Sequence, residues 1–261
     1  MELRGSVALV TGAGSGIGRA AALRLAAEGA TVGVLTHASD EGLAVAQEIA
    51  EKGGRGIPIT VDVSDVVKLG AAIEGFVSRA GRIDIVLANA GINGVWAPID
   101  ELQPDDWSHT VHTNLFGTYL TLHYVVPHLK KAGGGSIIVV SSINGTRVFS
   151  NTGATAYACT KAGQMVMVRM LALELAKHRI RVNAICPGAI DTEIEDNTRR
   201  RNVEREKEPA EYPRGTVPLT GGQPGSPEDV AELVLFLASK RSAHITGTPV
   251  WIDGGQSQLQ G

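Results

Sequence analysis

The sequence lacks the features that would place the protein outside the ordinary globular class. It has only two cysteines, Cys159 and Cys186, which are too few for a disulfide framework or a zinc-ribbon site. No stretch approaches the roughly 18 consecutive apolar residues of a membrane-spanning helix, and residues 1–5 carry no apolar signal region. The net charge of −3 gives no electrostatic reason to expect nucleic acid as a partner. We therefore expect a soluble, cytoplasmic protein with reduced thiols and with neither nucleic acid nor membrane as a partner.

Glycine and short apolar runs are abundant instead. There are 32 glycines, and hydrophobic residues make up 43% of the 261, enough for a sizeable core. Short apolar runs alternate with segments long enough for a helix, the first two of which we expect at 17–28 and 40–52. The apolar runs fall at 7–10, 31–35, 56–61, 83–88, 137–140, 181–185 and 249–252. This alternation predicts an α/β fold, a single doubly wound Rossmann-type domain over residues 1–261 with a seven-stranded parallel sheet flanked by helices on both faces.

The segment 191–225 interrupts this pattern, because it is charged at first and then rich in proline and glycine. A long insertion of this kind in a compact domain is often a functional lid. Acids interleave with the bases after the Arg199-Arg200-Arg201 run, so we interpret the charges as a solvated helix face. An alternative is that the arginines bind an anionic carrier such as an acyl-protein. Order returns at Ser226-Pro227-Glu228-Asp229, a strong start signal for a helix.

A glycine-rich loop, residues 11–18, follows the first expected strand and precedes the first expected helix. A dinucleotide pyrophosphate binds at this place in a doubly wound fold, because glycine lets the backbone approach the phosphates and the helix N-terminus offers unpaired N–H groups. The glycines Gly12, Gly16 and Gly18 fit the spacing G-x-x-x-G-x-G rather than G-x-G-x-x-G. A purely structural turn is the alternative, and the position after the first strand favours a cofactor.

Tyr157 and Lys161 are four residues apart, and on a helix their Cβ atoms stack about 6 Å apart. A lysine charge at that distance, in an effective dielectric of about 20, stabilises a phenolate by about 2.8 kcal/mol, or about two pKa units. Tyr157 thereby becomes a candidate general acid and base near neutral pH. The pair also occurs by chance on solvated helices, so its meaning depends on the motifs around it.

Taken together, these motifs and several others resemble the short-chain dehydrogenase/reductase family over nearly the whole chain. The order and spacing of the matching segments carry the resemblance. They are Thr11 to Gly18, Asp62-Val63, Asn89-Ala90-Gly91, Asn114-Leu115-Phe116-Gly117, Ser142 at the end of a strand, Tyr157-x-x-x-Lys161, Pro187-Gly188 with Thr192, and Asp253-Gly254-Gly255.

The resemblance implies an oxidoreductase that transfers a hydride between NAD(P)(H) and a ketone or secondary alcohol. Tyr157 then exchanges a proton with the substrate oxygen, and Ser142 holds that oxygen in place. Lys161 lowers the pKa of Tyr157 and bonds the nicotinamide ribose, while Asn114 holds a water that links Lys161 to solvent. A non-catalytic nucleotide-binding regulator on the same fold is the alternative, and a methyltransferase of related fold is a third. Regulators of this kind can lose the tyrosine or the lysine, and both are present here. A methyltransferase would have no reason to keep Ser142, Tyr157 and Lys161.

The resemblance also implies the residues that contact the cofactor. They are Gly12, Ser15, Gly16, Ile17, Gly18, Thr36, His37, Asp62, Val63, Asn89, Ala90, Gly91, Tyr157, Lys161, Pro187, Gly188, Ile190 and Thr192. The position that carries a carboxylate in NAD-binding relatives is Thr36, so the acid that repels a 2′-phosphate is missing there. Although no Lys or Arg follows the strand, and Ser15 stands where many NADP-using relatives have a basic residue, we expect NADP(H) ahead of NAD(H).

One departure from the family concerns substrate recognition. Ser142 and Tyr157 are fifteen residues apart, about two more than usual, and the extra length falls within 146–155 beside the expected substrate mouth. We expect Asn144 and Phe149 to contact substrate there. The inner residues of the lid are expected to include Ile194, Tyr212 and Val217, giving a moderately apolar pocket for a neutral or weakly polar ketone or secondary alcohol.

Two further expectations concern metals and assembly. His109 and His112 are three residues apart without an evident third ligand, so we expect no metal site. The resemblance implies a homotetramer in which the helices of Asn114 and Tyr157 pack against a neighbouring subunit. The apolar stretch 165–175 is compatible with that packing.

Overall fold

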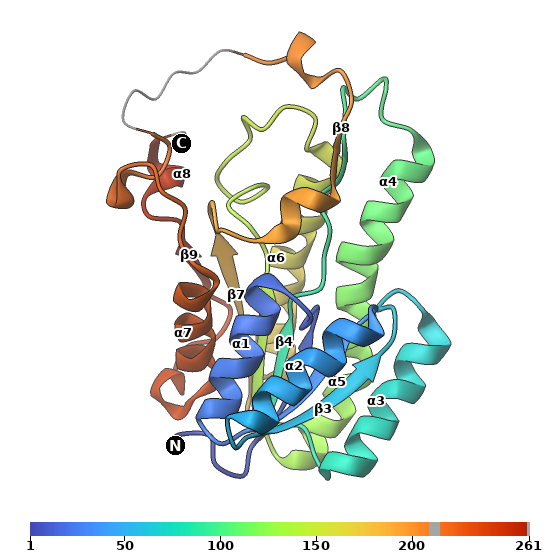
Figure 1. Cartoon of the computed structure of the whole chain (residues 1–261), viewed down its shortest axis with the longest axis vertical. Helices are drawn as coiled ribbons and strands as arrows, with labels where there is room; N and C mark the ends of the chain where they lie inside the picture. Colours follow the sequence, from blue (N-terminus) through green and yellow to red (C-terminus); the bar gives the residue numbers. More distant parts are fainter. Residues whose placement is uncertain (209–214, 260–261) are drawn as a thin grey trace.

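The computed structural model describes residues 1–208 and 215–259, so the predicted lid residue Tyr212 lies outside the described residues. Its centre is a seven-stranded parallel sheet in the order β3-β2-β1-β4-β6-β7-β9 (Figure 1). The strands are β1 (Val7–Thr11), β2 (Thr31–Thr36), β3 (Arg55–Thr60), β4 (Ile85–Ala88), β6 (Gly135–Val140), β7 (Ile180–Pro187) and β9 (Pro249–Ile252). The predicted fold class and all seven predicted strands are confirmed.

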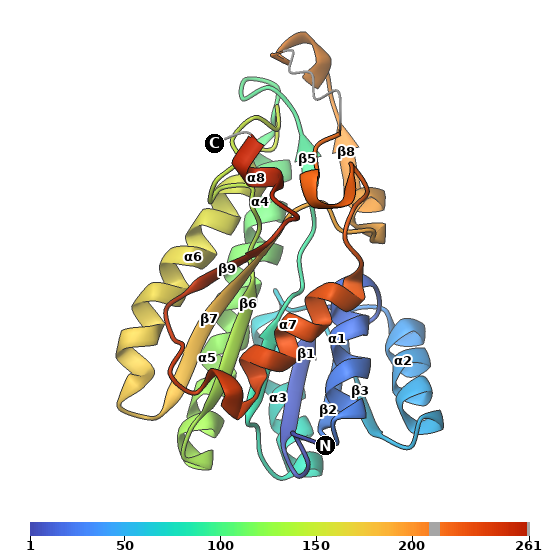
Figure 2. The same ribbon diagram turned by 90° about the vertical axis from the view of Figure 1, so that its left-hand side faces the viewer.

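Helices cover both faces of this sheet (Figure 2). They are α1 (Gly16–Ala27), α2 (Ser39–Glu51), α3 (Val66–Ala80), α4 (Pro104–Val111), α5 (Gly117–Ala132), α6 (Thr155–Ala176) and α7 (Pro227–Ala238), with a short α8 (Gln256–Leu259) near the end. Successive residues of one strand face opposite sides, so Ala8 and Val10 pack under α1, α2 and α7. Val7 and Leu9 pack instead with α3, α5 and α6. The apolar runs are continuous because both sides of each strand are buried.

The strand order reverses between β1 and β4, which are neighbours in the sheet although β2 and β3 lie between them in sequence. In doubly wound sheets the ligand binds in the crevice beyond the carboxyl ends of the strands at this switch point. The glycine loop follows β1 and the Asn89-Ala90-Gly91 segment follows β4. The fold therefore brings the two predicted cofactor motifs to one crevice.

A second, two-stranded parallel sheet pairs β5 (Gly94–Trp96) with β8 (Thr198–Arg200), and neither strand was predicted. The interpretation of the arginine run as a helix face was wrong, because Arg199 and Arg200 lie in β8. The Arg200 guanidinium stacks 5.2 Å from the centroid of the Trp96 ring. Arg201 donates to the carbonyl oxygen of Glu101 at 2.9 Å and pairs with Asp106 at 3.2 Å. These contacts fasten the first part of the 191–225 segment to the residues around α4.

The two ends of the 191–225 segment meet. Asp191 N donates to Gly225 O at 2.9 Å, and Gly225 N donates to Ala189 O at 3.0 Å. The described residues of this segment include three short helical turns, η2 (Glu193–Asn197), η3 (Val203–Arg205) and η4 (Pro218–Thr220). Directly after it α7 starts as predicted, since Ser226 Oγ accepts from Asp229 N and the Asp229 carboxylate accepts from Ser226 N. No helix in the described ranges is both long and apolar enough to span a bilayer.

Candidate active site

The glycine loop is locked onto the end of β4 by hydrogen bonds. Thr11 Oγ1 accepts from the backbone N–H groups of Asn89 and Ala90 at 3.0 and 3.1 Å. The Asn89 amide in turn donates to the carbonyl oxygens of Thr11 and Gly12, both at 3.1 Å. A methyl group at Gly12, whose φ is +63°, would lie 2.9 Å from Ala90 Cα, and one at Gly18 would lie 2.7 Å from Asn89 Nδ2. Glycine is required at both positions because the two loops touch.

Beyond this contact the N-terminus of α1 opens into the crevice. Ser15 caps the helix in an extended conformation, with φ −145° and ψ 177°, and among the described residues its side chain makes no capping hydrogen bond. The first-turn N–H groups keep their hydrogen-bonding capacity and the positive end of the helix dipole for an anion. Across the crevice Thr192, at the start of the 191–225 segment, approaches Gly16, since a Cβ on Gly16 would lie 3.2 Å from Thr192 Cγ2. The shape and the donors fit a dinucleotide pyrophosphate.

The crevice is a cleft of about 790 Å³, a volume typical of cofactor sites. Most of the residues predicted to contact the cofactor line it. They are Gly12, Ser15, Gly16, Ile17, Thr36, His37, Asp62, Val63, Asn89, Ala90, Gly91 and Thr192. The predicted lid residue Ile194 lines it as well, and so does Glu41, which the sequence analysis missed.

The other predicted cofactor residues lie behind or beside this cleft. Gly18 packs against the Gly12 carbonyl, and Ile190 packs with the core under α7. Pro187 is the last residue of β7, and Gly188 follows it and donates from its backbone N to Ile252 O at 3.0 Å. Tyr157 and Lys161 are both buried on α6. Contact of Tyr157 and Lys161 with the nicotinamide half of a cofactor stays a prediction.

Asn114 lies in a π-helical turn, η1 (His112–Phe116), between α4 and α5. Such turns occur frequently at functional sites. The Asn114 amide donates to Ile92 O at 2.9 Å and to Thr160 Oγ1 at 3.2 Å, and its Oδ1 accepts from Ile92 N at 2.8 Å. Its own carbonyl accepts from Thr118 Oγ1 and Gln164 Nε2 at 2.7 and 2.9 Å. Asn114 therefore ties the segment after β4 to α6.

Lys161 is the buried cation of the site, with 3% of its surface exposed. Its Nζ donates to Val140 O at 2.9 Å and lies 5.4 Å from the centroid of the Tyr157 ring, as the helical spacing predicts. Burial lowers the pKa of this amine to about 8. A Cβ on Gly91 would lie 3.2 Å from Asn114 Oδ1 and 3.6 Å from Lys161 Nζ. Gly91, which lines the cleft, therefore lies directly against the side chains of Asn114 and Lys161.

The two serines at the end of β6 have different surroundings. Ser141 Oγ donates to Lys161 O at 2.9 Å and so braces α6. Ser142 Oγ accepts from Asn144 N at 3.1 Å, and Ser142 O accepts from Thr146 Oγ1 at 2.6 Å. The loop they begin packs on α6 beside Tyr157, because a Cβ on Gly145 would lie 3.2 Å from Ala158 Cα. The structure thus brings Ser142 and Tyr157 to the same end of α6 and commits Ser141 to a structural contact.

The lengthened loop after Ser142 presents its two apolar residues in opposite ways. Val148 is 2% exposed, whereas Phe149 is 76% exposed and lines neither of the cavities described here. Asn144 Oδ1 accepts from Asn151 Nδ2 at 2.7 Å, which holds the loop together across its mouth. Val203 of the 191–225 segment is buried against this loop, since a Cβ on Gly153 would lie 2.7 Å from Val203 Cγ1. Val203 was not among the predicted inner residues, whereas Val217 was, and Val217 is buried against Gly254.

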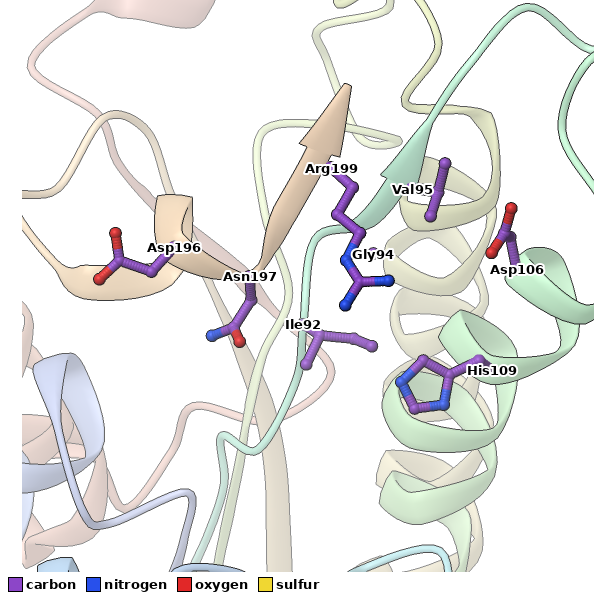
Figure 3. Close-up of a pocket in the computed structure, with 8 residues that line it drawn as sticks. All are labelled: Ile92, Gly94, Val95, Asp106, His109, Asp196, Asn197 and Arg199. Atoms are coloured by element: carbon purple, nitrogen blue, oxygen red, sulfur yellow. The ribbon is translucent and has the colours of Figure 1, made fainter. Parts of the chain in front are cut away.

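A smaller cavity of about 210 Å³ adjoins the cleft below β5 and β8 (Figure 3). Arg199 of β8 and His109 of α4 contribute to its wall, together with Ile92. His112 bonds instead to its own helix, through Ser108 O at 3.2 Å. Within residues 1–208 and 215–259, no three His, Cys, Asp or Glu side chains are grouped so that they could hold a metal ion.

The glycine loop at the switch point and the buried Lys161 beside the Tyr157 ring are together typical of a dinucleotide-dependent enzyme. Comparisons with known proteins match nearly the whole chain to reductases. A family model described as enoyl-(acyl carrier protein) reductase matches residues 12–257. The chain is 39% identical to a 3-oxoacyl-[acyl-carrier-protein] reductase of Thermotoga maritima, over 98% of this chain and 99% of that one.

Solved structures agree with this result. A 3-ketoacyl-ACP reductase from Sinorhizobium meliloti has a TM-score of 0.95 and 60% identity, covering 97% of this chain and 99% of that one. A 3-ketoacyl-(acyl-carrier-protein) reductase from Brucella melitensis, complexed with NADH, has a TM-score of 0.86 and 32% identity, covering 98% and 99%. The chain belongs to the short-chain dehydrogenase/reductase family, as the motifs predicted. It is an NAD(P)-dependent oxidoreductase that transfers a hydride between the cofactor and a ketone or secondary alcohol.

Proposed function

We propose that Tyr157 is the general acid and base of this reaction, with Ser142, Lys161 and Asn114 in supporting roles. The observation that carries the proposal is the burial of the Lys161 ammonium 5.4 Å from the Tyr157 ring, beside the floor of the cleft. When bound, the nicotinamide supplies or accepts the hydride. Tyr157 gives its proton to the substrate oxygen in reduction and takes it back in oxidation.

The neighbouring groups prepare this proton transfer. The Lys161 charge stabilises the phenolate, and burial strengthens that effect because the local dielectric is low. Ser142 Oγ offers a hydrogen bond to the substrate oxygen where negative charge develops. Through its hydrogen bonds to Ile92 and Thr160, Asn114 holds the segment after β4 against α6. Its proposed additional role is to hold the water that returns protons to Lys161.

The test of this mechanism is Tyr157→Phe, which keeps the ring and removes the proton. Turnover is expected to fall about a hundredfold or more, the contribution of general acid catalysis, while the Kd of the dinucleotide stays unchanged. Tyr124→Phe serves as the matched control, because its hydroxyl bonds Val66 O on α3, away from the cleft. Near-normal turnover in Tyr157→Phe would refute the assignment.

For the substrate we propose a neutral or weakly polar ketone or secondary alcohol. The buried side chains Val148 and Val203 near the catalytic end support an apolar pocket. Arg200 and Arg201 are engaged with Trp96, Glu101 and Asp106, which weakens the alternative of an anionic acyl-protein carrier bound by the arginine run. Because the relatives named above are 3-oxoacyl reductases, a substrate panel should include 3-oxoacyl thioesters beside ketones, sugars and secondary alcohols.

Phe149 is the residue whose role in substrate choice we test first. If its ring closes over the substrate mouth, Phe149→Ala changes the relative kcat/KM values across the panel without altering dinucleotide affinity. Ile99→Ala removes another exposed apolar side chain, 69% exposed against 76%, and serves as the control. If Phe149→Ala leaves the relative kcat/KM values across the panel unchanged, residues other than Phe149 determine substrate choice.

We further propose a cytoplasmic homotetramer. An exposed apolar stripe on α6, made by Val166, Met170 and Leu173, supports the assembly, and these residues are 60%, 68% and 83% exposed. Tyr119 on α5 adds a further half-exposed ring. Cys159 and Cys186 are free thiols, as in a reducing compartment.

The sequence alone favours NADP(H), because Thr36 and His37 stand where an acid would repel a 2′-phosphate. This preference stays a prediction. The position of Glu41 in the cleft counts against it.

A further inference from the structure

Glu41 brings a carboxylate to the end of β2 from an unexpected direction. It lies in the first turn of α2 and lines the cleft together with Gly14 and Thr36. A Cβ placed on Gly14 would lie 2.9 Å from Glu41 Cβ and 3.1 Å from Thr36 Oγ1, and it would collide with Glu41 Oε2. The carboxylate of α2 therefore lies directly on the glycine loop, beside the hydroxyl of the last residue of β2.

This is the place where doubly wound folds recognise the adenosine ribose. In such folds an acid about 20 residues after the glycine loop accepts a hydrogen bond from the ribose 2′-hydroxyl, whereas an arginine accommodates a 2′-phosphate. Thr36 and His37 occupy the usual position of that acid here. Glu41 supplies the missing charge from the adjoining helix, so the absence of an acid at Thr36 does not leave the ribose site neutral.

The charges around Glu41 also disfavour a phosphate. The cleft is lined by four carboxylate residues, Glu41, Asp62, Glu193 and Asp196, and among its described lining residues there is neither a lysine nor an arginine. Arg19, the first arginine after the glycine loop, is held by Glu48 at 2.6 Å, and Glu48 also pairs with Lys52. The imidazoles of His37 and His109 are the basic groups on the cleft wall.

We infer that Glu41 is the residue that selects the cofactor, and that it makes the enzyme prefer NAD(H) to NADP(H). This inference rests on the dinucleotide site of the proposed function. The Glu41 carboxylate accepts hydrogen bonds from the adenosine ribose hydroxyls, and the same charge repels a 2′-phosphate, which is itself an anion. The inferred preference for NAD(H) is the opposite of the preference for NADP(H) expected from the sequence.

The experiment measures the Kd of NADH and of NADPH for the full-length protein by nicotinamide fluorescence or calorimetry, without substrate. Wild type is expected to bind NADH at least tenfold more tightly than NADPH. Glu41→Gln is isosteric, and it is expected to shrink the ratio of the two Kd values by tenfold or more, the size of one charge-assisted hydrogen bond. Glu41→Lys is expected to reverse the preference. Asp40→Asn removes the same charge from the neighbouring position, which does not line the cleft, and should leave the ratio unchanged.

The outcomes separate this inference from the function beneath it. If wild type binds NADPH as tightly as NADH or more tightly, or if Glu41→Gln leaves the ratio unchanged while it binds both cofactors, Glu41 does not select the cofactor. Failure of wild type to bind either dinucleotide would instead overturn the assignment of the cleft. Because Glu41 is exposed on the surface of α2, its replacement does not disturb the core, and a thermal melt of each variant verifies this.

Discussion

The buried Lys161 ammonium carries a cost in stability that can be measured. Burial lowers the pKa of the amine from 10.5 to about 8, so protonation is less favourable in the folded chain than in the unfolded one. At pH 7 both states hold the proton. The folded state is then penalised by about 3 kcal/mol, which is the free energy equivalent of that difference in pKa. Lys161→Met removes the penalty together with the catalytic charge.

The dependence on pH isolates this effect. Between pH about 8 and about 10.5 the unfolded chain binds more protons at this residue than the folded chain, so the wild-type free energy of unfolding rises with pH. From pH 7 to 9.5 about 2 kcal/mol of the penalty disappears. The variant also loses the hydrogen bond to Val140 O, which changes the absolute stability at every pH. The change in the free energy of unfolding with pH therefore tests the burial of Lys161 more directly than its absolute value does.

The assay is urea unfolding of the cofactor-free protein at pH 7 and pH 9.5, at one protein concentration. Relative to Lys161→Met, wild type is expected to gain about 2 kcal/mol between the two pH values. Lys130→Met, which removes an exposed lysine from the last turn of α5, should show no such change relative to wild type. If the difference between wild type and Lys161→Met stays constant with pH, the lysine is not the desolvated cation described here.

Two further predictions follow from the same structure. In the direction of reduction, kcat/KM is expected to fall as the pH rises through about 8, because Lys161 then loses the charge that supports Tyr157, and a profile flat to pH 10 would contradict this role. Leu173→Glu places a charge in the exposed stripe of α6 and is expected to reduce the mass seen in light scattering from a tetramer to a smaller species, while Leu219→Glu, equally exposed at 82%, leaves it unchanged. A monomeric wild type at micromolar concentration would refute the assembly.

The sheet could be predicted from the sequence because strands buried on both sides leave continuous apolar runs. Each such run lies in a strand, with ends differing by a few residues, as at β7, which extends to Pro187. The spacing of Tyr157 and Lys161 likewise predicted their stacking, because helix geometry is local. What could not be predicted is that the Lys161 ammonium is almost fully buried. That depends on Val140, Gly91 and Asn114, which are distant in sequence.

Other features depended on contacts without a local signal. The π-helical turn at Asn114 is bound by Gln164 and Thr118, and no pattern in residues 112–116 marks it. The strands β5 and β8 have three residues each and are about a hundred residues apart, too short for a periodicity. Glu41 looked like an ordinary acid in the first turn of a helix, which is favourable there in any case. Only the approach of α2 to the glycine loop gives it a place in the cleft.

The meeting of the two ends of the 191–225 segment has a consequence for how such enzymes diversify. Because Asp191 and Gly225 are bonded to each other, the segment that follows β7 begins and ends at nearly one point, just before α7. The entropy of closing a loop grows only slowly with its length, so insertions between these ends disturb the sheet little. We therefore expect the segment to be exchangeable while the sheet and the catalytic residues stay constant. Grafting the corresponding segment of a relative between Asn197 and Gly225, which keeps the cleft-lining residues up to Asn197, should transfer substrate scope while the cofactor site is inherited intact.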